Sequence, residues 1–174
     1  NKVSDDFIDE NNLNLPMAIA YLQNSADIAK AKELLVKITG MELTLNELIA
    51  NLLLETRHDS LAYTVYKEEI LTNPEPHIST FTTCSLLGEL FDTPENLFII
   101  LKKGIAIYPE NAELLNATGY FIALYEVEDE YDKAEKYLKK AVTLVPKSEM
   151  IWDSLGWLHY KQKRYNEALD RKSV

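Results

Sequence analysis

Along most of the chain, apolar residues recur three or four positions apart, which is the spacing that places them on one face of an α-helix. Leu34, Leu35 and Ile38 follow it in the segment 26–39, and the segment 45–57 carries a second stripe of this kind. The 174 residues include only 5 glycines and 6 prolines, whereas good helix formers such as Leu, Ala, Lys and Glu are frequent. The sequence therefore predicts an all-α fold.

Capping signals divide this pattern into helix pairs. Thr44 and Glu47 have the spacing of a capping box, and Thr93 stands directly before a proline, which is favoured in the first turn. The residues expected to cap helices are Ser25, Thr44, Asp59 and Thr93. The predicted helices cover about 16–24, 26–39 (stopped by Gly40), 45–57, 59–73, 77–91, 94–108, 111–125 and 130–145, and two more begin near 148 and 165.

The second helices of these pairs recur at a nearly constant interval. Their opening small or apolar residues are 35, 37 and 34 positions apart: Ala62, Leu97, Ala134 and Ala168. Pro74, Pro109 and Pro146 follow successive second helices and repeat the gaps of 35 and 37. A period near 34 residues indicates a solenoid built from stacked helix pairs.

A motif near the end of the chain resembles the tetratricopeptide repeat (TPR). Trp152 is followed by Leu155-Gly156, by His159-Tyr160 and then by Tyr165 and Ala168. The family pattern is W-x2-L-G-x2-Y, then A-x3-F, then P. The preceding unit has the same register, with Leu115, Thr118, Gly119, Ile122, Tyr131, Ala134, Leu138, Ala141 and Pro146. The resemblance implies a right-handed α-solenoid of about five antiparallel helix pairs that acts as a protein-binding scaffold and not as an enzyme.

The predicted organisation is a lead-in segment over 1–13 and a TPR-like helical repeat domain over 14–174. The expected units are 14–42, 43–77, 78–111, 112–148 and an incomplete 149–174. Gly119 and Gly156 fall inside helices, where glycine costs about 1 kcal/mol relative to alanine. We expect close contact with the partner helix to offset this cost, with Ala134 opposite Gly119 and Ala168 opposite Gly156.

The later repeats contain Gly119-Tyr120, Tyr131-Asp132-Lys133-Ala134-Glu135 and Asp153-Ser154-Leu155-Gly156-Trp157. With these residues they resemble the closing repeats of TPR lipoproteins of Gram-negative bacteria. That resemblance implies a periplasmic, outer-membrane-tethered adaptor, some relatives of which present clients to processing proteases; a cytoplasmic location is the alternative. The chain begins with Asn1 and not with Met, so we expect it to be part of a longer protein. We expect no direct membrane insertion, because no apolar run approaches the roughly 20 residues that span a bilayer.

Charge and residue chemistry narrow the expected partners. The net charge of −10, from 28 acidic and 18 basic residues, disfavours nucleic acid as a partner.

Glu55 and His58 have the spacing of half a di-iron motif, but the sequence contains no second half of that motif. His159 takes a packing position, and Cys84 lies on an apolar face, where a structural role is expected. We therefore predict no catalytic residue, metal site or cofactor.

The first helix of each pair is expected to line a concave groove that binds a protein or peptide partner. The predicted groove residues are Glu47, Asn51, Leu54, Glu55, Thr82, Leu86, Glu89, Asn116, Tyr120, Leu124, Asp153, Trp157, Tyr160 and Lys161. Tyr120 and Trp157 occupy equivalent places in successive units and form a candidate anchor for a peptide or helix. The alternative is that Trp157 packs beneath a C-terminal continuation.

The predicted groove residues include one basic residue, Lys161. We therefore predict that the groove does not bind acidic C-terminal tails and that a basic or mixed apolar segment fits it better.

A second hypothesis is self-association. We expect Leu155, Leu158 and Leu169 to leave an apolar edge that attracts a second copy, giving a homodimer through the incomplete last repeat.

Overall fold

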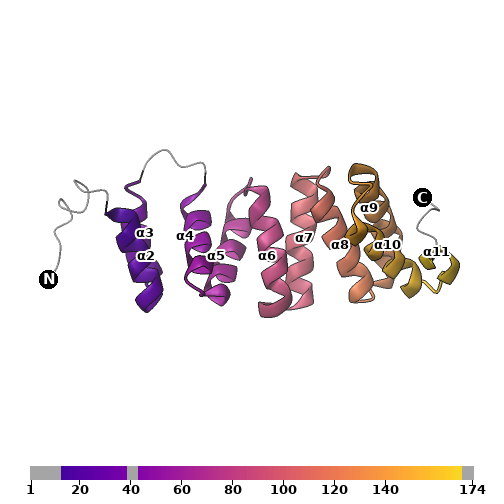
Figure 1. Cartoon of the computed structure of the whole chain (residues 1–174), viewed down its shortest axis with the longest axis horizontal. Helices are drawn as coiled ribbons and strands as arrows, with labels where there is room; N and C mark the ends of the chain where they lie inside the picture. Colours follow the sequence, from indigo (N-terminus) through magenta and orange to yellow (C-terminus); the bar gives the residue numbers. More distant parts are fainter. Residues whose placement is uncertain (1–12, 39–42, 170–174) are drawn as a thin grey trace. The chain divides into compact units, whose positions relative to one another are not determined.

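The structure is a computed structural model that describes residues 13–38 and 43–169 (Figure 1). All regular elements in these residues are helical, which confirms the predicted all-α class. The chain divides into two compact units, residues 1–80 and 81–174, which are described separately. None of the helices in the described part of the chain is both long and apolar enough to cross a membrane.

The first unit contains two antiparallel helix pairs. The first pair is α2 (Asn14–Ser25) with α3 (Ile28–Leu35), and the second is α4 (Leu45–Glu55) with α5 (Asp59–Thr72). Its buried side chains come from the apolar stripes that the sequence indicated, and they include Leu22, Leu34, Leu35, Ile49, Leu53 and Ile70.

The second unit carries the clearest repeats. Its helices are α6 (Ile78–Phe91), which begins in the first unit, α7 (Pro94–Ile107), α8 (Ala112–Leu124), α9 (Tyr131–Leu144), α10 (Glu149–Lys161) and α11 (Tyr165–Leu169). Helix α8 packs against α9, and α10 packs against α8, α9 and α11 (Figure 1). A short 3₁₀ helix, η1 (Glu128–Glu130), fills the lengthened turn before α9. Leu138, Ile122 and Leu158 are fully buried in the core of this unit.

Most helix boundaries agree with the sequence prediction, because local caps determine them. Thr44 and Glu47 form the predicted capping box, and the Thr93 side chain accepts a hydrogen bond from Asn96 N. The Asn111 side chain caps α8 in the same way.

Two predicted caps were wrong. Ser25 is the last residue of α2, and its hydroxyl donates to Tyr21 O, while Asp27 caps α3 instead. The intervening Ala26 is left-handed, with φ of 50°, and α3 begins two residues later than predicted. Asp59 is the first helical residue of α5 and provides no side-chain cap. Helix α3 ends at Leu35; the predicted stop at Gly40 and the lead-in over 1–12 lie outside the described residues.

Gly119 and Gly156 both lie at close helix contacts, but one expected partner was wrong. A Cβ atom placed on Gly119 would lie 2.5 Å from Leu138 Cγ, so Leu138, and not Ala134, occupies the space beside it. Leu138 lies one turn after Ala134 on α9. A Cβ atom on Gly156 would lie 3.2 Å from the backbone oxygen of Ala168, as the repeat register predicted.

Candidate functional site

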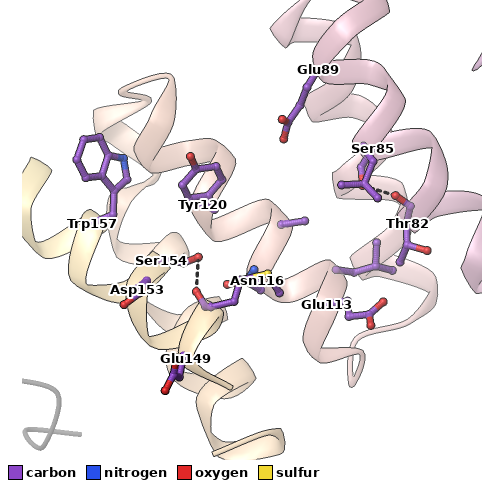
Figure 2. Close-up of a pocket in the computed structure, with 14 residues that line it drawn as sticks. Thr82, Ser85, Glu89, Glu113, Asn116, Tyr120, Glu149, Asp153, Ser154 and Trp157 are labelled. Carbon is purple, nitrogen blue, oxygen red and sulfur yellow. Dashed lines mark hydrogen bonds between the residues drawn. The ribbon is translucent and has the colours of Figure 1, made fainter. Parts of the chain in front are cut away.

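A cleft of about 990 Å³ lies on the first helices of the three pairs in the second unit (Figure 2). Helices α6, α8 and α10 each contribute side chains one turn apart, because residues at i, i+3 and i+4 share a helix face. Tyr120 and Trp157 lie near one end of the cleft, and Glu113 and Glu149 near the other (Figure 2).

The cleft brings together seven residues of the predicted groove. They are Thr82, Leu86, Glu89, Asn116, Tyr120, Asp153 and Trp157. Sequence reasoning missed Ser85, Glu113, Leu114, Ala117, Glu149, Met150 and Ser154. Most of these lie one position or one turn from a predicted residue on the same helix, so extending the groove stripe to neighbouring positions would have found them.

Three other predicted residues of the second unit do not line the cleft. Leu124 ends α8. Tyr160 stacks on Trp157 with ring centroids 5.5 Å apart. Lys161 pairs with Glu126 at 2.6 Å, and its Nζ lies 4.9 Å from the centre of the Trp157 ring. Tyr160 and Lys161 were predicted to line the groove, but they contact the Trp157 ring and do not line the cleft.

The four predicted residues of α4 belong to the first unit and do not contribute to this cleft. Glu47 was placed wrongly, because it is 2% exposed and its carboxylate accepts hydrogen bonds from Thr44, His77 and Thr80. Glu47 therefore has a structural role and does not line a binding groove. Asn51 accepts a hydrogen bond from the Tyr66 hydroxyl. Leu54 is half-buried and Glu55 is exposed.

The cleft combines exposed apolar side chains with negative charge. Leu86 is 70% exposed and Met150 61%, while Tyr120 and Trp157 are each a little over one third exposed. Four carboxylates line the cleft, those of Glu89, Glu113, Glu149 and Asp153, and no Lys, Arg or His side chain does. Exposed apolar side chains with a polar surround are typical of interaction surfaces.

Asn116 occupies the middle of this arrangement on α8. Its side chain is 7% exposed, and its Oδ1 atom accepts no hydrogen bond from the residues that the structure describes. A buried amide oxygen without a donor costs free energy, which an incoming N–H group would recover.

Comparisons with known proteins agree with the repeat architecture. No protein-family model matches the chain. It is 32% identical over 107 residues to a TPR repeat-containing protein of Pseudomonas aeruginosa, a match that covers 62% of the chain and 18% of that protein. It is 31% identical over 118 residues to the ribosomal protein L11 methyltransferase of Listeria monocytogenes, covering 66% of the chain and 37% of that enzyme.

Solved structures extend the likeness over nearly the whole chain. A crystal structure of the MamA protein, a TPR-like protein, has a TM-score of 0.64 with 13% identity, covering 92% of this chain and 86% of that one. MamA from Desulfovibrio magneticus has a TM-score of 0.63 with 16% identity, covering 94% and 91%. The chain has the tetratricopeptide-repeat fold. This confirms the resemblance that the sequence motif indicated.

The chain spans less than two fifths of the length of either curated relative. The matched region is 37% of the Listeria enzyme, and the methyltransferase activity in that protein's name is not transferred to this chain.

A charged cluster connects α9 with the turn before α11. Arg164 donates to Glu135 at 2.7 Å, and Lys139 lies 2.9 Å from the same carboxylate. Burial alone would raise the pKa of Glu135, but these hydrogen bonds outweigh it and lower the pKa to about 2. The buried His159 ring lies 3.5 Å from Glu135, in the packing position that the repeat register predicted.

Cys84 is fully buried in α6. A thiol in such surroundings is shielded from reagents, which agrees with the structural role predicted for it.

Proposed function

We propose that this chain is a protein-interaction scaffold that holds a peptide or a partner helix in the cleft of its second unit. The observation that carries the proposal is the group of exposed side chains Leu86, Tyr120 and Trp157 around a cleft of about 990 Å³. In TPR-like folds this face is formed by the first helix of each pair, and it offers side chains from several repeats to one partner. A non-enzymatic role is part of this proposal.

Tyr120 and Trp157 are the expected anchors. Large aromatic side chains contribute a disproportionate share of binding energy when a partner covers them. Trp157 is held in place by stacking with Tyr160 and by the nearby Lys161 ammonium, so little side-chain freedom would be lost on binding.

Selection from a random peptide library displayed against the purified chain tests the proposal. We expect Tyr120→Ala or Trp157→Ala to weaken the selected peptides by roughly tenfold or more. Tyr125→Ala is the matched control, because Tyr125 is also exposed but does not line the cleft. Peptides that bind equally to all three variants would show that the cleft is not the binding site.

The more specific proposal, a periplasmic adaptor that presents a client to another enzyme, is supported by the sequence resemblance to TPR lipoproteins. Fractionation of cells that produce the full-length protein tests the compartment. Recovery in the cytoplasmic fraction would contradict a periplasmic role and leave the cleft proposal intact.

Self-association is the second candidate function, and the apolar side chains near α11 favour it. Leu169 is 85% exposed and Tyr165 54%. The predicted edge is smaller than expected, because Leu155 and Leu158 are buried in the core that α10 shares with α8 and α9. Light scattering at tens of micromolar distinguishes the candidates: a dimer lost in Leu169→Glu supports self-association, and a strictly monomeric chain contradicts it.

A further inference from the structure

Three of the four carboxylates that line the cleft lie towards one end, and the fourth, Glu89, lies in the last turn of α6. Glu113 and Glu149 lie in the first turns of α8 and α10, and Asp153 follows one turn later on α10. Tyr120 and Trp157 lie two turns further along the same helices (Figure 2). The cleft therefore has an acidic end and an aromatic end.

The distance between the two ends corresponds to about two turns of an α-helix. Glu113 and Tyr120 are seven residues apart on α8, which corresponds to about 10 Å along the helix axis. A partner helix lying beside α8 would place side chains at i and i+7 over the same distance. One face of such a helix can thus meet both ends of the cleft at once.

Asn116 adds an observation that does not depend on the carboxylates. It lies between the two ends on α8, it is more than nine tenths buried, and its Oδ1 lacks a hydrogen-bond donor among the described residues. The last torsion of an asparagine side chain has a broad range of favourable angles. The Asn116 amide can therefore turn to meet a donor on the partner. A Lys or Arg side chain entering the cleft would supply the missing donor.

Cationic side chains fit the carboxylates better than a metal ion does. In the part of the chain that the structure describes, no three His, Cys, Asp or Glu side chains are close enough to hold one ion. Carboxylates spread over a surface instead attract a partner that carries several separated positive charges.

We propose that the occupant of the cleft is a basic amphipathic helix of a partner protein. Its bulky apolar side chains contact Tyr120 and Trp157, and its Lys or Arg side chains lie beside Glu113, Glu149 and Asp153, with one of them donating to Asn116. The inference rests on the proposed scaffold function and adds to it the chemistry and the orientation of the bound segment.

The peptides selected against the purified chain provide the probe. We expect them to be enriched in Lys and Arg spaced three to seven positions from a large apolar residue, and to become helical on binding as measured by circular dichroism. The triple variant Glu113→Gln/Glu149→Gln/Asp153→Asn should weaken them by roughly five- to tenfold. It should also reduce the dependence of the affinity on salt.

Glu128→Gln is the matched control, because Glu128 is exposed and does not line the cleft. It should leave the affinity unchanged. Asn116→Leu should weaken the same peptides, and circular dichroism of each free variant should confirm that it is folded.

The outcomes separate this inference from the proposed function. Neutral or acidic peptides that depend on Tyr120 and Trp157 would overturn the basic helix and leave the scaffold standing. Basic peptides that bind the triple variant as tightly as the original chain would do the same. A library that yields no peptide dependent on either aromatic residue would contradict both.

Discussion

Glu47 and Thr80 are 33 residues apart in sequence, yet the Thr80 hydroxyl donates a hydrogen bond of 2.6 Å to the Glu47 carboxylate. Both residues are almost completely buried. The same carboxylate accepts hydrogen bonds from the backbone N–H groups of Thr44 and His77, each at 2.9 Å. One side chain thus completes the cap of α4 and holds the segment that leads into α6.

Replacing Glu47 by Ala should destabilise the first unit. The variant loses half of the capping box and leaves the donors of His77 and Thr80 without their acceptor, which together should cost about 2–4 kcal/mol. Urea denaturation followed by circular dichroism measures the change. Glu55→Ala on the exposed side of the same helix is the control, and equal effects of the two substitutions would refute a structural role for Glu47.

The contact between Gly119 and Leu138 predicts an unusual response to alanine. Alanine favours a helix by about 1 kcal/mol over glycine, but a Cβ atom at this position would lie 2.5 Å from Leu138 Cγ. Overpacking of this kind costs about 1–3 kcal/mol, so Gly119→Ala should be neutral or destabilising in spite of its better helix propensity.

A double-mutant cycle with Leu138→Ala isolates the clash. The cost of Gly119→Ala should fall, or become a gain, when the Leu138 side chain is absent. An identical cost in both backgrounds would show that the clash does not determine the outcome.

The hydrogen bonds from Arg164 and Lys139 to Glu135 make stability depend on pH. The folded-state pKa of Glu135 is about 2, below the ordinary value of 4.5, so the unfolded chain takes up the proton first as the pH falls. The contribution of Glu135 is therefore fully present above about pH 4.5 and disappears as the pH falls towards 2. Glu135→Gln should cost roughly 1–3 kcal/mol at pH 7.

Denaturation of both proteins at a series of pH values measures this effect. The difference in unfolding free energy between Glu135→Gln and the original chain should shrink between pH 4.5 and pH 3. A difference that does not change over this interval would contradict the assignment, and Glu128→Gln shows the background of an exposed carboxylate.

In residues 13–38 and 43–169, four turns inside helix pairs place a residue other than glycine in the left-handed region: Ala26, Arg57, Glu126 and Lys163. Lys163, with φ of 62°, is exposed between α10 and α11. Because a side chain in this conformation costs roughly 1 kcal/mol, Lys163→Gly should raise the midpoint of thermal unfolding. Lys147→Gly, in a turn between pairs without a positive φ, should give no such increase.

The local signals in the sequence were sufficient for the helices and their repeat. The capping box at Thr44, the cap at Thr93 and the prolines after second helices act over a few residues, so the boundaries they indicate agree with the structure. The Ser25 prediction failed because its hydroxyl had a competing acceptor in the preceding turn, which the residue type alone does not reveal.

By itself, the sequence determined the all-α class, the period near 34 residues and the helix face that carries the candidate cleft, because periodicity is a property of neighbours along the chain. Only the tertiary structure decided that Glu47 is buried in a hydrogen-bond network, that Leu138 lies against Gly119, and that Leu155 and Leu158 are covered. Each of these contacts involves a side chain that lies about 15 to 35 positions away in the sequence. The spacing of apolar residues within one helix does not show which distant residue packs against it.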